Sequence, residues 1–400
     1  MNWCVVTVAT TSHLAGVGAL AESLRLHHPN IALHACLVEG VARRRRSAGL
    51  EQVPCFDARD CFPTAREWAR FSFQYPAFPL AAALKPRALR HVLLKTAADA
   101  VIFLDSDIFV TAPLDPLLES LEAGSIVITP HRIRPSRTHA DVARLVHGGQ
   151  MGTYNSGVVA TRSDATGCDF LDWWAVATLT DCVDDRPRRV FVDQSWLEFV
   201  PALFAHVVVC RNPGVNVGYW NLDERSLALA GGCWHAGSEP LCTFHFSGFD
   251  PANPEPLSRY ADPNHVAAEN IRAVAPLARD YAAAVLRHGH DECSTQPYAF
   301  QTLTDGTRIE PPWRELFRSG HESVASIDDP FDAMGRVSGI NMTAWYRRHA
   351  HAAAATSTAS LAWWRFKDLW MRFGRLPGVR TFLSRFAAWR QVVAEARRWH

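Results

Sequence analysis

The stretch AVIFLDSDIFV, residues 100–110, decides the fold expected of this chain. Five apolar residues run directly into Asp105, Ser106 and Asp107, after which apolar residues resume. A continuous apolar run of this length is typical of a central parallel strand that is buried on both faces. An isolated buried carboxylate costs several kcal/mol, so the two aspartates must be hydrated, paired or neutralised. The first question is therefore which group neutralises them.

The segments around this stretch alternate between strand and helix patterns. Residues 3–9 and 31–40 are short strand-like runs, and the leucines in segment 15–28 between them have helical spacing. This order predicts a βαβ unit at the edge of a mostly parallel sheet. Further strands are predicted at 100–104, 125–130, 156–162 and 205–210. We therefore expect an α/β body with a mixed, Rossmann-like sheet and helices on both faces, extending over residues 1–250.

A helix is predicted directly before the central strand. Residues 84–96, LKPRALRHVLLKT, favour a helix that begins near Pro86 and turns Leu84, Leu89 and Val92 inward. This helix carries Lys85, one of three lysines in a chain whose other cations are arginines.

The composition of the chain changes after residue 250. Residues 251–350 begin with a proline-rich, turn-forming segment and continue into an alanine-rich helix at 266–288, which we interpret as an acceptor-side or lid extension. Residues 351–400 begin with a low-complexity hinge, and a helical C-terminal tail follows it. From residue 361 on, this tail holds nine Lys or Arg, two acidic residues and five Trp. Such amphipathic helices lie in membrane interfaces; the alternative is packing against the protein or a second subunit.

Composition excludes several classes of protein. The formal net charge of +1 argues against a nucleic-acid-binding protein. The N-terminus has no basic region before its short apolar run, so we expect no secretory signal or membrane span there and a cytoplasmic location. The ten cysteines include no C-x-x-C pair, which favours reduced thiols over a zinc site.

The aspartates are candidate metal ligands. In open α/β sheets, ligands bind outside the carboxyl ends of the strands, and Asp105 and Asp107 follow the strand at 100–104. Side chains two residues apart on an extended segment point to the same side, so both carboxylates can converge on one cation. Mg²⁺ and Mn²⁺ prefer such oxygen ligands and are often shared with substrate phosphates.

Several motifs in a fixed order resemble a known family. They are LKPRALRHVLL at 84–94, VIFLDSDI at 101–108, YNSGVVATR at 154–162, FVDQSWLEFV at 191–200 and FHFSG at 244–248. This order resembles the GT-A fold glycosyltransferases, and most closely the retaining family-8-like enzymes, which include lipooligosaccharide galactosyltransferases and glycogenin. The resemblance covers residues 3–250 and implies a GT-A fold for the α/β body.

The resemblance implies a metal-dependent hexosyltransferase. Asp105 and Asp107 would hold Mn²⁺ or Mg²⁺ with His245 as third ligand, and the metal would bridge the diphosphate of a nucleotide sugar, by likeness a UDP-sugar. The residues around His245 agree, since FHFSG alternates polar and apolar residues and would bring the imidazole out at a strand end. A neutral imidazole is an acceptable Mn²⁺ ligand.

Further residues are expected to bind the donor. Thr10 and Thr11 end the first strand and would contact the nucleotide, or they simply cap the following helix. Tyr154 and Asn155 would form a wall against the sugar, with Gly157 allowing close approach of the backbone, although a turn before a strand uses the same residue types. The full donor-binding set is Thr10, Thr11, Lys85, Asp105, Ser106, Asn155, Ser156 and Gly248.

Asp193 and Gln194 are the candidate catalytic pair. The resemblance places the pair beside the anomeric carbon, where their oxygens would stabilise an oxocarbenium-like centre. The alternative is that Asp193 caps the helix that follows it. The resemblance to retaining enzymes favours retention of configuration at the anomeric carbon. If Asp193 instead reaches the acceptor hydroxyl, it serves as a general base and the reaction inverts the configuration.

Two segments depart from the family pattern. The loop after His245 has no basic residue, so phosphate contacts would come from Lys85, Arg87 or the backbone at Gly248. The segment GVNVGYWNL at 214–222 replaces a short loop. Its Asn and aromatic residues suit a sugar or acceptor platform, with core packing as the alternative.

The acceptor is expected to be a glycan or lipid-linked glycan of surface polysaccharide or lipopolysaccharide synthesis at the cytoplasmic face of the inner membrane. Homo-oligomerisation is left open. A nucleotidyltransferase is a rival, but ATTSHLAGVG at 9–18 lacks the basic residue of a triphosphate loop. A non-catalytic membrane-surface scaffold is the other rival, and it predicts no metal-dependent nucleotide binding.

Overall fold

The chain forms two compact units. The computed structural model describes residues 1–43, 48–135, 138–139, 142, 151–261, 268–320 and 324–349. The first unit comprises Met1–Leu303 and Asp328–Phe331, and the second comprises Thr304–Ile327 and the chain from Asp332 on. The expected boundary at residue 250 falls inside the first unit, because α8 (Ala268–Arg287) packs on α1 (Leu14–His27). The predicted tail at 351–400 lies outside the described residues.

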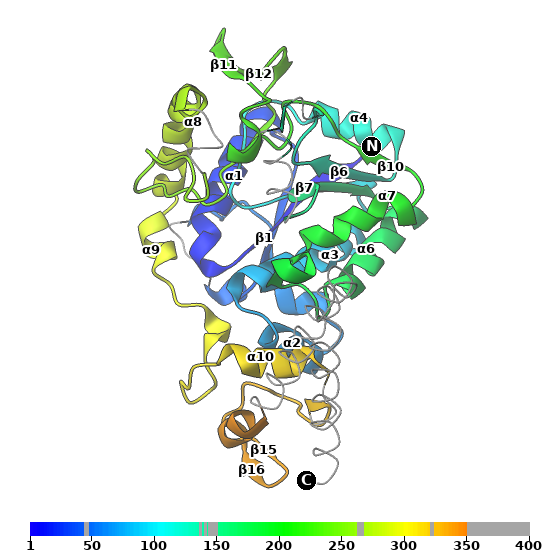
Figure 1. The fold of residues 1–400 in the computed structure, drawn as a ribbon, viewed down its shortest axis with the longest axis vertical. Coiled ribbons are helices and arrows are strands. Elements are labelled where there is room, and N and C mark those ends of the chain that lie inside the picture. The colour runs from blue at the N-terminus through cyan, green and yellow to red at the C-terminus, as the bar shows by residue number, and fades with distance from the viewer. Residues whose placement is uncertain are drawn as a thin grey trace, which may run out of the picture. The chain divides into compact units, whose positions relative to one another are not determined.

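A seven-stranded mixed sheet forms the centre of the first unit (Figure 1). Its spatial order is β10 (Val207–Val209), β6 (Ile126–Pro130), β7 (Tyr154–Arg162), β4 (Ala100–Leu104), β1 (Trp3–Ala9), β2 (Leu33–Leu37) and β3 (Cys55–Asp57). Neighbouring strands are parallel except that β7 runs antiparallel to both β4 and β6. The predicted mixed α/β sheet is confirmed.

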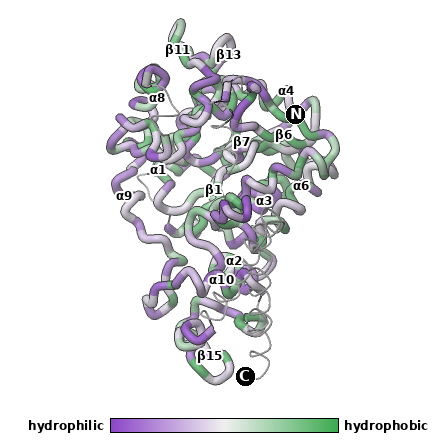
Figure 2. Tube along the Cα trace, viewed as in Figure 1, coloured by the Kyte–Doolittle hydropathy of each residue, from purple (hydrophilic) through white to green (hydrophobic). Residues whose placement is uncertain are grey.

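Strand β4 is buried on both faces, as its apolar run predicted. All five of its residues are buried. Ala100, Ile102 and Leu104 belong to the core that includes α1 and α8, whereas Val101 and Phe103 belong to the core that includes α3 (Ala77–Thr96) and α6 (Ala165–Ala177). Hydrophobic and hydrophilic residues are interspersed along α3 and α6 (Figure 2), as expected of helices with one face on a sheet. Helices therefore cover both faces.

Helix α3 begins earlier than predicted. It starts at Ala77 rather than near Pro86, and Pro86 lies buried in its interior. Alanine and leucine between residues 80 and 84 are strong helix formers, and Pro79 lies in the first turn, where a missing N–H leaves no bond unmade. The inward direction of Leu84, Leu89 and Val92 is confirmed, and Lys85 is buried with them.

One strand pair outside the main sheet brings distant parts of the chain together. Strand β5 (Ile108–Val110) follows β4 after a tight turn and pairs antiparallel with β14 (Thr243–His245). In this register His245 lies opposite Ile108, one residue after Asp107. The pairing therefore places the end of β14 beside the turn between β4 and β5.

Further elements complete the two units. The first unit also contains α2 (Ala65–Phe73), α4 (Asp115–Ala123), β8 (Asp184–Asp185), β9 (Val190–Phe191), α7 (Val200–Leu203), β11 (Leu227–Ala230), β12 (Cys233–Ala236), β13 (Glu239–Pro240) and α9 (His290–Ser294). The second contains α10 (Pro311–Arg318), β15 (Arg336–Val337) and β16 (Ile340–Asn341). In the part of the chain that the structure describes, no helix has the length and apolar character needed to cross a bilayer.

Candidate active site and metal centre

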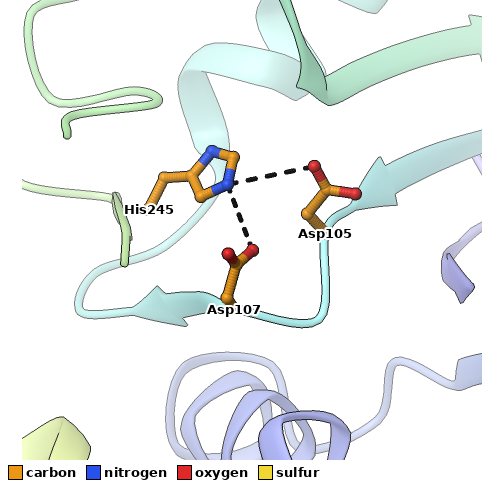
Figure 3. A group of neighbouring side chains, drawn as sticks. All are labelled: Asp105, Asp107 and His245. Atoms are coloured by element: carbon orange, nitrogen blue, oxygen red, sulfur yellow. Dashed lines mark ion pairs between the residues drawn. The ribbon is translucent and has the colours of Figure 1, made fainter. Parts of the chain in front are cut away.

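Asp105, Asp107 and His245 converge at the carboxyl end of β4 (Figure 3). One ligand atom from each residue lies within 4.8 Å of the others. The Nε2 atom of His245 is 3.1 Å from Asp107 Oδ1 and 3.9 Å from Asp105 Oδ2. The three predicted metal ligands are therefore neighbours in space.

Backbone hydrogen bonds hold these three residues in place. The N–H of Asp105 donates to Gly157 O at 2.9 Å, and the N–H of Ile108 donates to Asp105 O at 3.0 Å, which closes the turn after β4. The N–H of Phe246 donates to Asp107 O at 2.8 Å. These bonds tie the turn between β4 and β5 to β7 and to the residue that follows β14, so they fix the backbone that carries the carboxylates and the imidazole.

His245 and Asp107 form an ion pair. Burial acts to raise the pKa of Asp107, but the neighbouring imidazole lowers it below its ordinary value. Burial acts to lower the pKa of His245, but Asp107 and then Asp105 raise it. Both directions have the same cause, which is that each charge stabilises the other.

Lys85 neutralises the other carboxylate. Its Nζ atom lies 3.1 Å from Asp105 Oδ1, 3.5 Å from Asp193 Oδ2 and 3.1 Å from Ser156 Oγ. Burial disfavours the charged lysine, yet the two carboxylates together raise its pKa. In this structure the neutralising groups for the aspartates after β4 are thus Lys85 and His245.

Asp193 is a buried partner of Lys85 and not a helix cap. Asp193 is fully buried, and its side chain makes no hydrogen bond to the N–H groups that follow it. Burial raises the pKa of Asp193, against the effect of Lys85. The residues after it, Gln194–Phe199, form a 3₁₀ helix. The capping alternative is therefore wrong.

Gln194 is held at both ends of its amide. Its Oε1 atom accepts from the N–H of Ser156 at 3.1 Å, and its Nε2 atom donates to Met151 O at 2.6 Å. Gln194 is buried like its neighbour Asp193. The two residues of the predicted catalytic pair therefore both contact the Lys85–Ser156 region, through a carboxylate and an amide respectively.

One of the residues predicted to form a wall against the sugar, Asn155, is hydrogen-bonded within the protein. Asn155 is buried, and its Oδ1 atom accepts from the N–H of Gly157 at 2.9 Å and from Asn216 Nδ2 at 3.1 Å. A Cβ atom on Gly157 would lie 2.5 Å from Cε1 of His245, so no larger residue fits there. Gly157 is thus required by the imidazole of His245.

The two threonines after β1 contact groups that sequence reasoning missed. Thr10 Oγ1 lies 2.8 Å from His13 Nδ1, and the N–H of Thr11 donates to Glu39 Oε2 at 2.9 Å. The capping alternative for Thr10 is not realised by a side-chain bond. Glu39 follows β2 at the same edge of the sheet, which is the signal that could have identified it.

Gly248 and Ser106 are constrained by their neighbours. Gly248 has φ +70°, and a Cβ atom there would lie 2.5 Å from the Tyr260 ring. Its carbonyl oxygen accepts from the N–H of Arg259 at 3.0 Å. The carbonyl of Ser106 lies against Gly16 of α1, where a Cβ atom would approach it to 2.6 Å.

Two expectations at the site are wrong. Arg87 was a candidate for binding the phosphate. It donates instead to Ala175 O of α6 at 2.8 Å, and its guanidinium lies over the Phe71 ring, so its contacts are within the protein interior. The amides expected to form a sugar platform, Asn216 and Asn221, are buried and hydrogen-bonded within the protein. The sequence of this segment alone cannot reveal that its two amides turn inward.

The aromatic part of the same segment packs on the metal centre. The Trp220 ring meets His245 edge to face at 5.2 Å and His131 at 5.7 Å between ring centroids. Trp220 is half-buried there, so one part of its ring contacts these histidines and another part stays accessible.

These observations define a mixed α/β protein with a candidate Asp-Asp-His metal centre at the carboxyl end of β4. No protein-family model matches the chain. In sequence it is similar to two uncharacterized proteins of Bacillus subtilis (strain 168). It is 32% identical to YfnF over 176 residues, covering 42% of this chain and 55% of YfnF. It is 25% identical to YfnD over 173 residues, covering 42% and 52%. The chain thus spans about half the length of the curated relatives it matches.

Solved structures similar to this chain include three glycosyltransferases. The galactosyltransferase LgtC, solved with donor and acceptor sugar analogues, has a TM-score of 0.37 and 17% identity over 68% of this chain and 95% of that chain. The glycosyltransferase GlyE of Streptococcus pneumoniae has a TM-score of 0.41 and 14% identity over 76% and 66%. Mouse xyloside xylosyltransferase 1 has a TM-score of 0.37 and 14% identity over 61% and 97%.

Proposed function

We propose that this protein is a metal-dependent GT-A glycosyltransferase that moves a sugar from a nucleotide-diphosphate sugar, by sequence resemblance a UDP-sugar, to a glycan or lipid-linked acceptor. The observation that carries the proposal is the convergence of Asp105 and Asp107, from the turn between β4 and β5, with His245 of β14. Ligand-binding residues of open α/β sheets lie at this edge, and the aspartates follow the central strand there.

The residues present fit a divalent cation. Two carboxylates and an imidazole form a mixed oxygen and nitrogen donor set, which suits Mn²⁺ better than Mg²⁺ or Ca²⁺. The absence of a side chain at Gly157 leaves the space that the imidazole occupies. When bound by Asp105, Asp107 and His245, the cation would offset the negative charge of a diphosphate leaving group.

Lys85 supplies a second positive charge to the same region. It is buried, its pKa is raised, and its Nζ atom contacts both Asp105 and Asp193, so it remains charged across the physiological range. We propose that it holds Asp105 in position and adds to the electrostatic stabilisation of the departing diphosphate.

The remaining donor-binding assignments are proposals of the same kind. Thr10 and Thr11, with Glu39 beside them, would bind the nucleoside, since hydroxyl, amide and carboxylate groups there can pair with a uracil edge or a ribose. Backbone and small side-chain groups would approach the sugar and the phosphates; these residues are Ser106, Asn155, Ser156 and Gly248.

Retention of configuration is the stereochemistry we propose. A general base must reach the acceptor hydroxyl, whereas Asp193 is fully buried and its carboxylate faces Lys85. This arrangement disfavours the inverting alternative, in which Asp193 is the base. The role of Asp193 and Gln194 beside the reacting sugar is proposed from the sequence resemblance alone.

The acceptor and the location are proposed from the sequence. The composition of residues 361–400 favours a reversible attachment to an anionic membrane surface, to which each basic residue contributes about 1 kcal/mol. That composition supports an acceptor from surface polysaccharide or lipopolysaccharide synthesis, and a location at the cytoplasmic face of the inner membrane.

Calorimetric titration with UDP, with and without Mn²⁺, tests the proposal. We expect UDP to bind at least about tenfold more tightly with Mn²⁺, because the cation adds positive charge beside the diphosphate. A matched control is Asp172→Asn, which removes an exposed carboxylate paired with Arg90 and should leave UDP binding unchanged. Equal UDP binding with and without Mn²⁺ contradicts the proposal. Preferential binding of UTP over UDP-sugars would instead favour a nucleotidyltransferase.

A further inference from the structure

A chain of polar side chains, buried except for the half-buried His131, leads away from the metal centre. It contains His245, Asn216, Asn155 and His131, which come from β14, the 214–222 loop, β7 and the segment after β6. Successive members lie within hydrogen-bond distance: 3.3 Å from His245 Nδ1 to Asn216 Oδ1, 3.1 Å from Asn216 Nδ2 to Asn155 Oδ1, and 3.3 Å from Asn155 Nδ2 to His131 Nε2.

Backbone groups fix the direction of these bonds. The carbonyl oxygen of Gly152 can only accept, so His131 Nδ1, 2.8 Å away, must donate to it. The N–H of Gly157 can only donate, so the atom of Asn155 that accepts from it at 2.9 Å is Oδ1. The other amide atom, Nδ2, therefore points to His131 Nε2, which accepts in the neutral ring.

The hydrogen bonds of Asn216 determine which of its amide atoms faces His245. Its Nδ2 atom donates to Asn155 Oδ1 and, at 2.8 Å, to the hydroxyl oxygen of Thr129. The Thr129 hydroxyl in turn donates to Val158 O at 3.0 Å, so its oxygen is an acceptor for Asn216. With both amide protons used, the oxygen of Asn216 faces His245 Nδ1, which must be the donor.

The remaining ring nitrogen of His245 is then the ligand atom. In the ion pair with Asp107 both ring nitrogens of His245 carry a proton. When the ring is neutral, as a metal ligand must be, its single N–H is on Nδ1 and the lone pair is on Nε2. Nε2 is the atom that faces Asp107 and Asp105 at 3.1 and 3.9 Å. Without the Asn216 oxygen, Nδ1 of a neutral His245 would have no acceptor. The tautomer with the proton on Nε2 would then be the more stable one, because it donates a hydrogen bond to Asp107.

The backbone holds Asn216 in this place. Its φ of +54° lies in the left-handed region, which asparagine adopts more readily than most residues. Its N–H donates to the Thr243 hydroxyl at 2.8 Å, and the N–H of His245 donates to Val217 O at 2.7 Å. These bonds tie the 214–222 loop to β14, and Asn216 is only 1% exposed.

We propose that Asn216 is a positioning residue for the metal centre: it holds the proton of His245 on Nδ1 and leaves Nε2 free to bind the cation. This inference rests on the proposed function. Outer hydrogen bonds to a ligating histidine are worth about 10- to 100-fold in metal affinity, so the effect is measurable without substrate.

Two substitutions at this position separate the roles of the oxygen and of the fold. Asn216→Gly removes the amide and keeps the left-handed backbone, so we expect Mn²⁺ alone to bind about 10- to 100-fold more weakly. Asn216→Asp keeps an acceptor oxygen toward Nδ1 and should lose less than about tenfold. The matched control is Thr161→Val, which deletes a buried hydroxyl that donates to Ser125 O at 3.1 Å and should leave Mn²⁺ affinity unchanged.

The proton position is measured directly on metal-free protein. Nitrogen-15 NMR of histidine-labelled wild type, at a pH above the titration of its imidazoles, should show His245 protonated on Nδ1. In Asn216→Gly the proton should shift toward Nε2, whereas Asn216→Asp should keep it on Nδ1. Calorimetry or electron paramagnetic resonance gives Mn²⁺ affinity, and thermal unfolding confirms that each variant folds.

The outcomes distinguish this inference from the proposed function. Wild type that binds Mn²⁺ but carries the proton on Nε2, or a folded Asn216→Gly variant with wild-type Mn²⁺ affinity, overturns the role of Asn216 and leaves the glycosyltransferase proposal intact. Wild type that binds no Mn²⁺, with or without UDP, removes the metal centre from the proposed function, and the role of Asn216 falls with it. If Asn216→Gly does not fold, the wild-type proton position and Asn216→Asp still decide the question.

Discussion

The Nε2 atom of His245 lies 3.1 Å from Oδ1 of Asp107, although Asp107 precedes β5 and His245 ends β14. The antiparallel pairing of β5 with β14 produces this contact, because it sets His245 opposite Ile108. The ion pair and the candidate metal centre therefore depend on one register between two three-residue strands.

Replacing Asp107 should remove metal-dependent nucleotide binding. Asp107→Asn keeps the size of the side chain and removes its charge, so we expect the Mn²⁺-dependent part of UDP affinity to fall by at least about tenfold. Isothermal calorimetry measures it, with Asp172→Asn as the control. Unchanged Mn²⁺-dependent UDP binding in Asp107→Asn would exclude Asp107 as a ligand.

Lys85 should contribute to stability through its two carboxylates. Lys85→Met keeps the apolar stem but leaves Asp193 buried without a counter-charge, so the free energy of unfolding should fall by about 3 to 5 kcal/mol. Adding Asp193→Asn removes the stranded charge and should recover part of that loss. Urea unfolding of the two single variants and the double variant measures the coupling. Additive losses would show that Lys85 and Asp193 do not interact.

His131 should make the protein sensitive to acid. Burial lowers the pKa of His131 from 6.5 to about 4, with His245 and Arg225 adding to the effect against a hydrogen bond to Gly152. The unfolded chain then binds the proton more readily than the folded one between these values. The stability that neutral His131 contributes is thus present above pH 6.5 and is lost as pH falls toward about 4.

The loss attributable to His131 should reach up to about 3 kcal/mol, on top of the acid sensitivity of other groups. His131→Gln retains a donor for Gly152 and does not titrate. Unfolding free energies of both proteins between pH 7 and pH 4 should converge as pH falls. Parallel curves for wild type and His131→Gln would contradict this assignment.

Gly157→Ala should displace the imidazole of His245. The added Cβ atom would lie 2.5 Å from Cε1 of the ring, so Mn²⁺ affinity should fall while the fold is kept. Gly124→Ala is an equally crowded control, because its Cβ atom would lie 2.5 Å from His206 O, in the turn between α4 and β6. We expect Gly124→Ala to lower the unfolding temperature without weakening Mn²⁺ binding, and equal effects on Mn²⁺ binding would indicate general destabilisation.

The C-terminal residues should attach the protein to anionic membranes. Liposomes that contain anionic lipid should carry the full chain upward in a flotation assay and leave behind a version that ends near residue 355. The reason is that the basic and aromatic residues beyond 360 supply both charge attraction and apolar contact. Equal flotation of the two versions would reject the attachment.

Local patterns were sufficient for the elements that carry the site. The apolar run before Asp105 predicted β4, and the spacing of leucines predicted α1 and the inward face of α3, because both signals depend on residues close in the chain. The start of α3 was misplaced, since Pro86 is a helix-start signal that the buried packing of this helix overrides.

Side-chain direction could not be predicted in the same way. Asn216 and Asn221 were expected to face a ligand, and Arg87 a phosphate, but all three satisfy groups inside the protein. An amide or a guanidinium in a loop or on a helix has several potential partners, and burial of neighbouring segments selects among them.

The sequence by itself determined a mixed α/β body with two carboxylates at the end of its central strand, because strand burial and the position of polar residues along the chain are local properties. Only the tertiary structure decided what surrounds them: His245 on one side, Lys85 with Asp193 on the other, and Asn216 behind the imidazole. These contacts join segments far apart in sequence. They depend on strand register and on the requirement that every buried polar group find a partner, and neither is written in any short stretch of residues.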